Sequence, residues 1–116
     1  MHGPHTFSKQ NRIQHGFEFR RLYEHGRKTI GPMAVLYVGD GSPRTLGIVT
    51  SRKVGGAVQR NRARRLIRES YRLNQHKLKT NIQLVIVARS AINGKGMREV
   101  EAALCKQFQA AGIWAS

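Results

Sequence analysis

Apolar and polar positions alternate along this chain in blocks whose periods predict both helices and strands. Apolar residues spaced three or four apart predict helices, and short apolar runs bounded by turn residues predict strands. The predicted helices are residues 16–25, 57–74 and 97–111. The predicted strands are residues 27–30, 33–38, 45–51 and 82–88. The order α-β-β-β-α-β-α is typical of an α/β sandwich, a small mixed sheet with three helices packed against it.

Two connections set the expected topology. The stretch from Gly39 to Pro43 is rich in turn-forming residues, so we expect strands 33–38 and 45–51 to pair as a hairpin. Strand 45–51, helix 57–74 and strand 82–88 form a βαβ unit. General rules of chain connection predict a right-handed crossover for such a unit in about 98% of cases.

The helix at 57–74 has two chemically distinct sides. At about 100° per residue, its apolar side carries Ala63, Leu66, Ile67, Ser70 and Leu73. Its other side carries a stripe at i, i+4 spacing with close neighbours: Arg60, Arg64, Arg68 and Arg72, with Asn61 and Arg65 beside them and Arg62 on the rim. The like charges of these arginines repel one another. Within the helix, only Glu69 offers a compensating carboxylate, near Arg62 and Arg65. Guanidinium groups held outward at fixed spacing indicate a phosphate-rich partner.

Composition strengthens that interpretation. The chain has 116 residues, with 21 Lys and Arg against 6 Asp and Glu, a formal net charge of +15. Clustered basic residues at this charge density are typical of a nucleic-acid-binding protein. Cys105 is the only cysteine, which excludes an internal disulfide. Without a membrane-length apolar run or a secretory signal, we expect a cytoplasmic protein with a flexible basic arm at 1–15 and one RNA-binding domain at 16–112.

The sequence offers no catalytic constellation. The six acidic residues are scattered over a turn and three helices, and the histidines lack metal-ligand spacing. We therefore expect no catalytic residue and no metal site on the polypeptide. Arg52 and Lys53, followed by Gly55 and Gly56, precede the basic helix, whose N-terminus favours a phosphate.

Three aromatic residues are candidates for binding single-stranded nucleic acid. Phe19 and Tyr23 lie one helical turn apart, and Tyr37 lies on a strand that could face them. Stacking of a base on an aromatic ring contributes about 1–3 kcal/mol and tolerates any sequence. Core packing is the alternative, and for Phe19 alone it is at least as well supported. The hydroxyl groups of Tyr23 and Tyr37 favour a position open to water.

The residues from Arg52 to Glu69 closely resemble the motif of the bacterial ribonuclease P protein subunit. The matching positions are Arg52, Lys53, Val54, Gly55, Ala57, Val58, Arg60, Asn61, Arg62, Arg64, Arg65, Ile67, Arg68 and Glu69. The similarity extends over about residues 11–111. The chain departs from the family pattern at Tyr23, where Phe is usual, at Gly56, where Lys or Asn is common, and at Ala63, where a larger aliphatic residue is usual.

The resemblance implies a left-handed βαβ crossover, against the general rule. It implies that the catalytic RNA contacts Arg52, Lys53, Arg60, Asn61, Arg62, Arg64, Arg65 and Arg68. We add Arg72 to these candidate RNA-binding residues because it continues the i, i+4 arginine stripe. It implies that Phe19, Tyr23 and Tyr37 line a cleft for the 5′ leader of precursor tRNA. The chain would be the non-catalytic subunit of a 1:1 ribonucleoprotein endoribonuclease, with Mg²⁺ bound mainly by the RNA. The alternatives are a structural, ribosomal-type RNA-binding protein and a non-specific DNA-coating protein.

Overall fold

A computed structural model describes residues 16–115, with side chains from Phe19 onward. The helices are α1 (Gly16–His25), α2 (Ala57–Asn74) and α3 (Met97–Ala110), with short 3-10 helices at Gln75–Lys77 and Ser90–Ile92. The strands are β1 (Arg27–Ile30), β2 (Ala34–Asp40), β3 (Thr45–Val49) and β4 (Ile82–Ala88). The predicted order of helices and strands is confirmed, and each predicted boundary lies within two residues of the observed one.

The four strands form one mixed sheet in the order β1-β2-β4-β3. β2 is antiparallel to both β1 and β4, and β3 is parallel to β4. The predicted hairpin between residues 33–38 and 45–51 is therefore wrong, because β4 lies between those strands and the hairpin is β1–β2. β4 is apolar at six of its seven positions and takes an interior place, where both of its faces are covered.

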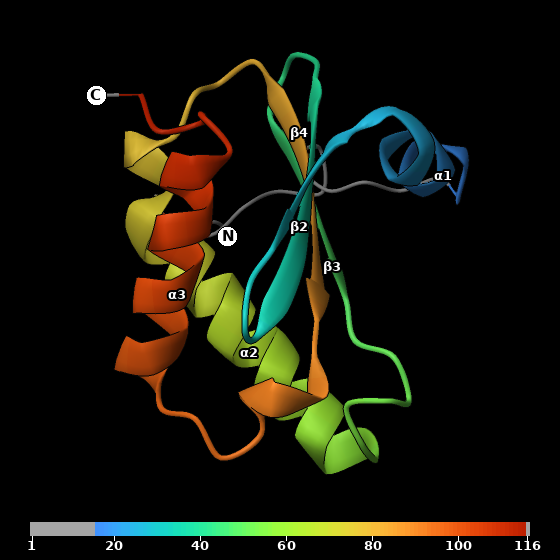
Figure 1. Ribbon diagram of the computed structural model, residues 1–116, viewed down its shortest axis with the longest axis vertical. Helices are drawn as coiled ribbons and strands as arrows, with labels where there is room; N and C mark the ends of the chain where they lie inside the picture. The colour runs from blue at the N-terminus through green and yellow to red at the C-terminus, as the bar shows by residue number, and fades with distance from the viewer. Residues whose placement is uncertain (1–15, 116) are drawn as a thin grey trace, which may run out of the picture.

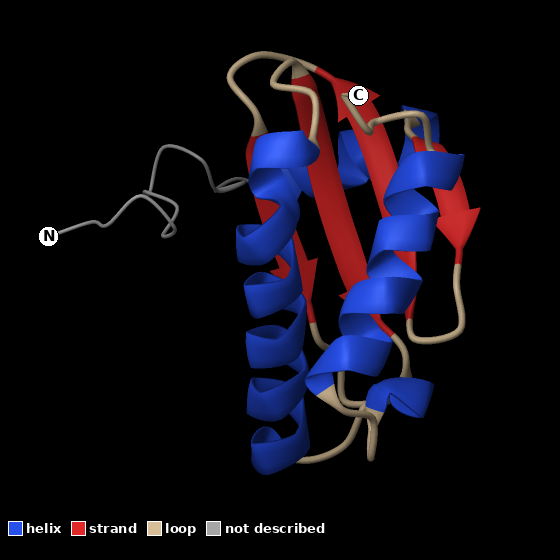
Figure 2. Ribbon diagram, turned by 90° about the vertical axis from the view of Figure 1, so that its left-hand side faces the viewer, coloured by secondary structure: helices blue, strands red, loops and turns tan. Residues whose placement is uncertain are grey.

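The connection from β3 through α2 to β4 is left-handed. In Figure 2, β3 and β4 both run downward, α2 lies in front of the sheet, and β4 lies to the right of β3. The general rule predicts the opposite hand, so the expectation that came from the family resemblance is confirmed.

The helices cover the two faces of the sheet unequally. Figure 1 shows α2 and α3 together on one face and α1 alone on the other. The main core lies between the sheet and α2 and α3, and it includes Leu36, Ile67, Ile86, Leu104 and Phe108. A smaller cluster under α1 is built around Leu22 and Val85, with Phe19, Tyr37, Val49 and Val87 packed against it.

The buried side of α2 is rotated from the predicted one. Ala63, Ile67 and Ser70 are buried as expected, but Leu73 is 41% exposed and Tyr71 is buried instead. The reason is α3, which packs alongside α2 and covers the side that carries Asn74. The Asn74 side chain donates a hydrogen bond of 2.8 Å from Nδ2 to Glu101 Oε2 on α3.

Glycines follow both α1 and α3, but only the one after α3 has the left-handed conformation of a helix cap. Gly112 follows α3 with φ +73°, the left-handed conformation that terminates many helices. Gly26 follows α1 without a positive φ, so the expected left-handed cap there is wrong. A Cβ atom at Gly26 would lie 2.5 Å from the Leu22 carbonyl oxygen, so close packing explains this glycine. Within residues 16–115, no helix is long and apolar enough to cross a membrane.

Candidate nucleic-acid interface

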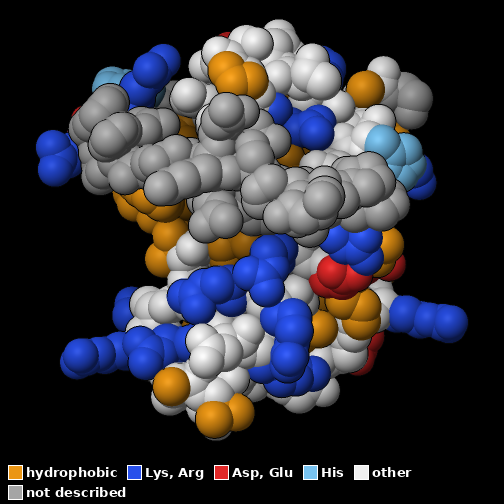
Figure 3. Space-filling model, turned by 180° about the vertical axis from the view of Figure 1, so that it is seen from behind, with side chains coloured by type: hydrophobic (Ala, Val, Ile, Leu, Met, Phe, Trp, Pro, Cys, Tyr) orange, Lys and Arg blue, Asp and Glu red, His pale blue; other side chains and the backbone are white. Residues whose placement is uncertain are grey.

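α2 presents the basic stripe on the side turned away from the core. Ala63, Ile67 and Tyr71 anchor the helix against the sheet and α3. Arg65 and Arg68 are exposed, and the other arginines of the stripe are partly exposed. On the face seen in Figure 3, Lys and Arg side chains gather over α2 and the loop that leads into it. The packing of α2 therefore holds the charged groups outward at fixed spacing.

Three of the predicted contact arginines have partners within the protein. Arg62 donates from Nη2 to the Lys95 carbonyl oxygen. Arg64 donates from Nη2 to Thr50 Oγ1 at 2.6 Å and lies 3.4 Å from Asn61 Oδ1. Arg72 forms an ion pair with Glu69, including a 2.9 Å bond from Nε to Oε2. Glu69 thus lies against Arg72, a pairing that the sequence analysis did not predict.

The other predicted basic side chains point to solvent without a partner among the described residues. These side chains are Arg52, Lys53, Arg60, Arg65 and Arg68. None of them forms a hydrogen bond or ion pair with another side chain in the described part of the chain. They are the cations best placed to meet phosphate groups, because no internal bond has to break first.

The loop before α2 is fixed in place. The Asn93 side chain donates a 2.6 Å hydrogen bond from Nδ2 to the Val54 carbonyl oxygen. Gly55 has φ +141°, a conformation that side-chain-bearing residues rarely adopt, and Gly56 begins the helix without a side-chain cap. The first N–H groups of α2 and the exposed Arg52 and Lys53 therefore lie on one short segment, suited to an anion.

The three predicted aromatic residues come together on the face of the sheet that α1 covers. The ring centroids of Phe19 and Tyr23 are 6.5 Å apart, and those of Tyr23 and Tyr37 are 4.8 Å apart, edge to face. Tyr23 is 43% exposed, while Phe19 and Tyr37 are partly buried against Leu22 and Val85. The cluster is therefore part of the small core and part of the surface.

Two features of this cluster bear on its chemistry. Partial burial raises the pKa of Tyr23, and the nearby Tyr37 hydroxyl raises it further. The phenol of Tyr23 therefore stays neutral at physiological pH. The Lys28 ammonium lies 5.8 Å from the centroid of the Tyr37 ring. Lys28 on β1 is the residue directly opposite Tyr37 on β2. A cation thus lies at the edge of the aromatic cluster.

The basic surface and the aromatic face meet at the end of β3. Val49 packs in the cluster under α1, and the next residue, Thr50, accepts the hydrogen bond from Arg64 of α2. Sequence reasoning did not identify Thr50, Lys28 or Lys95 as parts of the site. The pairing of β1 with β2 would have placed Lys28 opposite Tyr37, but that pairing was not predicted.

The described residues contain no group of three or more His, Cys, Asp or Glu side chains that could hold a metal ion. Glu69 lies beside Arg72, Glu101 bonds Asn74, and Asp40 lies at the end of β2, 3.7 Å from Arg27. These carboxylates do not converge, so they do not fit a metal-dependent nuclease site.

Comparison with known proteins identifies the family. A family model described as ribonuclease P matches residues 7–112. The ribonuclease P protein component of Clostridium acetobutylicum is 42% identical over 109 residues, covering 90% of this chain and 92% of that protein. The same component from Clostridium botulinum strain Loch Maree is 40% identical, covering 91% and 98% of the two chains.

Solved structures agree in fold. A Staphylococcus aureus RNase P protein mutant with defective mRNA degradation activity superposes with a TM-score of 0.84 at 26% identity, covering 91% of this chain and 92% of that one. The RNase P protein from Thermotoga maritima has a TM-score of 0.74 at 23% identity, covering 82% and 92%. With the family model and the close relatives both spanning most of its length, the chain belongs to the ribonuclease P protein family.

Proposed function

We propose that this chain binds the catalytic RNA of ribonuclease P through α2 and the loop before it, and that it assists removal of the 5′ leader from precursor tRNA. The observation that carries the proposal is the outward row of guanidinium groups on a helix anchored by Ala63, Ile67 and Tyr71. In the described part of the chain, Arg72 is the only arginine of that row paired with a carboxylate. A stripe left unneutralised in this way is suited to a folded polyphosphate.

The leader would bind along the face of the sheet beside α1. Tyr23 and Tyr37 offer ring surfaces there, and Lys28 offers a cation for the leader backbone. Stacking on rings tolerates any base, as a leader of variable sequence requires. Because Thr50 links the end of β3 to Arg64, one RNA could be held by α2 while the leader of its substrate lies on the adjacent face.

The chemistry of cleavage would belong to the RNA. The carboxylates of the described residues are scattered, so no step is assigned to a metal held by the protein. Magnesium ions would be bound by the RNA, and the protein would contribute binding and positioning of the substrate. A complex of one protein with one RNA suits a single basic helix surface.

Reconstitution tests the proposal. The purified chain is combined with a bacterial ribonuclease P RNA and a precursor tRNA at low magnesium, with the RNA alone as the control. Cleavage at the 5′ leader that depends on the protein supports the proposal. RNA binding without any effect on cleavage would instead support a structural RNA-binding protein, and equal binding to duplex DNA would support a DNA-coating protein.

A further inference from the structure

The loop between β4 and α3 lies at the end of the molecule where α2 begins. Figure 1 shows it at the lower end, together with the loop that leads from β3 into α2. The loop is anchored by Ile92, which is buried in the main core. We call residues 93–98 the α3 entry segment. It carries two cations, Lys95 and Arg98, which lie outside the family motif around α2.

Two hydrogen bonds tie the α3 entry segment to the basic surface. The Asn93 side chain donates from Nδ2 to the Val54 carbonyl oxygen at 2.6 Å, and the Arg62 side chain donates from Nη2 to the Lys95 carbonyl oxygen. The first bond reaches the loop before α2, and the second comes from α2 itself. Because both acceptors are backbone atoms, the bonds fix the entry segment in a defined position beside Lys53 and the basic stripe.

Arg98 lies on the side of α3 that faces α2. Glu101 follows it by three residues, so the two side chains share one side of the helix. Glu101 Oε2 accepts the hydrogen bond from Asn74 Nδ2 of α2. On α2, Arg65 follows Arg62 by the same interval and lies on the side that reaches the entry segment. Arg65 and Arg98 are both exposed, so the two helices present cations where they adjoin.

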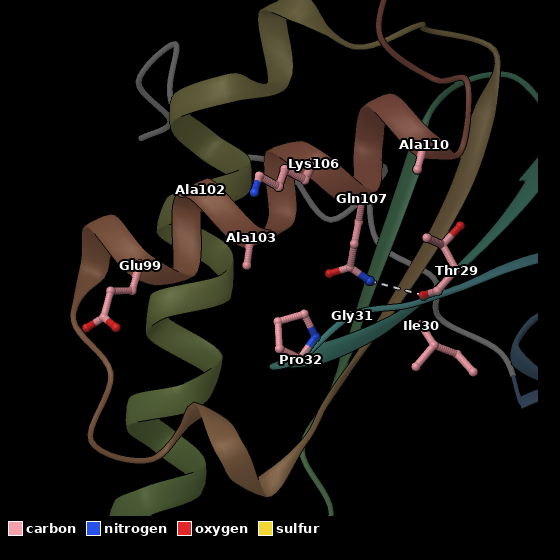
Figure 4. Close-up of a pocket in the computed structure, with 10 residues that line it drawn as sticks. All are labelled: Thr29, Ile30, Gly31, Pro32, Glu99, Ala102, Ala103, Lys106, Gln107 and Ala110. Carbon is pink, nitrogen blue, oxygen red and sulfur yellow. Dashed lines mark hydrogen bonds between the residues drawn. The ribbon is translucent and has the colours of Figure 1, made fainter.

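The two cations of the entry segment are not neutralised by the acids near them. Neither Lys95 nor Arg98 forms an ion pair in the part of the chain that the structure describes. Glu99 lines a groove between α3 and residues 29–32 (Figure 4), and its Oε1 accepts a 3.2 Å hydrogen bond from the Gly96 N–H. Arg98 also lies in the first turn of α3, where the positive end of the helix dipole opposes a cation. The stability of α3 therefore does not explain this arginine, whereas an anionic partner does.

The chemistry of the entry segment fits the phosphate groups of a folded RNA. Residues 93–98 contain no aromatic side chain on which an unpaired base could stack. Cations held on a fixed backbone suit phosphate oxygens. We propose that Lys95 and Arg98 bind phosphates of the same RNA that α2 binds, and that Arg62 is a positioning residue that holds the entry segment against α2. This inference rests on the proposed function and adds the start of α3 to its RNA interface.

The test is the salt dependence of RNA affinity for single variants of the full-length chain. The partner is a bacterial ribonuclease P RNA, and the Kd is measured at several KCl concentrations. Lys95→Ala and Arg98→Ala should each lower affinity and reduce the slope of log K against log salt by about one. Lys106→Ala is the matched control, because it removes one cation from the groove side of α3 (Figure 4). Its slope should equal that of the parent.

A double-mutant cycle separates positioning by Arg62 from direct contact with the RNA. If Arg62 acts through the entry segment, Lys95→Ala should cost little further affinity once Arg62→Ala is present. Additive losses would show direct contact and overturn the positioning role. Thermal unfolding of each variant confirms that it is folded at the temperature of the titration.

The outcome for the entry segment can be told apart from the outcome for the proposed function. Slopes for Lys95→Ala and Arg98→Ala that equal the slope for Lys106→Ala overturn the inference. If Arg68→Ala on α2 still reduces the slope in that case, the proposed function stands without the entry segment. A parent chain whose RNA affinity hardly changes with salt would reject both.

Discussion

The ring of Tyr23 on α1 meets the ring of Tyr37 on β2 edge to face, with centroids 4.8 Å apart. This contact joins the one helix on that side of the sheet to the centre of the sheet. Tyr23 remains 43% exposed, so the pair is both a packing contact and an accessible ring surface. A surface of this kind can take a nucleobase without rearrangement of the core, which is the basis of the first prediction.

Tyr37→Ala should weaken binding of precursor tRNA by about tenfold or more, since stacking on one ring contributes about 1–3 kcal/mol. Binding of mature tRNA, which has no leader, should change little. Tyr37→Phe is the matched control, because it keeps the ring and removes only the hydroxyl. The measurement is the Kd of the reconstituted complex for both RNAs. Equal losses for precursor and mature tRNA would rule out a leader site at these rings.

The arginines of α2 should differ in their effect on RNA affinity. Arg68 is exposed without a partner among the described residues, while Arg72 is held by Glu69. Arg68→Ala should lower affinity and reduce the slope of log K against log salt by about one. Arg72→Ala should have a smaller effect. The slope is measured by titration at several KCl concentrations, with thermal unfolding as the control for folding.

Glu69 offers the reverse test of the same idea. Glu69→Gln removes the carboxylate that pairs with Arg72 and makes that guanidinium available to phosphate. RNA affinity should therefore rise, and the salt dependence should steepen. Gln is close to Glu in size, so helix packing is preserved. An affinity that falls in this variant would mean that the ion pair itself orients Arg72 for the RNA.

Sequence patterns predicted those features that depend on neighbours along the chain. The 3.6-residue period located α2 and its two sides, and i, i+4 spacing placed Phe19 and Tyr23 together. Features set by distant segments were missed. Leu73 was expected to be buried, but α3 covers the side with Tyr71 and Asn74 instead. No local pattern around α2 specifies on which side a later helix packs.

The predicted strand pairing was wrong for the same reason, because a distant segment decides it. Residues 33–38 and 45–51 are close in sequence with turn residues between them, yet β4 from residues 82–88 lies between them. The error also hid part of the site, since Lys28 lies opposite Tyr37 only in the β1–β2 pairing. Likewise, the bonds from Arg62 to Lys95 and from Arg64 to Thr50 join segments 14 or more residues apart, which the motif alone does not reveal.

Arg44 should contribute to stability and not to RNA binding. Its Nη1 lies 2.9 Å from the Gln75 carbonyl oxygen and 3.1 Å from that of Leu78, just after the end of α2. Its guanidinium also lies 5.7 Å from the centroid of the Tyr71 ring. Arg44→Ala should lower the free energy of unfolding by about 1–3 kcal/mol, because carbonyls near a helix end lose a charged donor. Chemical denaturation measures the free energy of unfolding. At low temperature, where the variant remains folded, its RNA affinity should equal that of the parent.

Because of Tyr71, the free energy of unfolding should depend on pH above about pH 10. Burial raises the pKa of its hydroxyl above the ordinary value, although Arg44 acts in the opposite direction. In the unfolded chain the phenol ionises near pH 10, whereas in the folded chain it remains protonated to higher pH. The folded state therefore holds the proton more tightly. This contribution to stability is fully present below about pH 10 and is lost as the pH rises through the folded-state pKa.

The matching measurement is the free energy of unfolding from about pH 8 to pH 11, for the parent and for Tyr71→Phe. The parent should lose stability with a steeper slope above about pH 10 than the variant, which has no proton to release at that position. Tyr23 also has a raised pKa, so Tyr23→Phe is the control for the second phenol. The slope is the decisive quantity, because loss of the Tyr71 hydroxyl can change stability at neutral pH as well. Identical slopes in parent and Tyr71→Phe would show that the buried phenol does not govern alkaline unfolding.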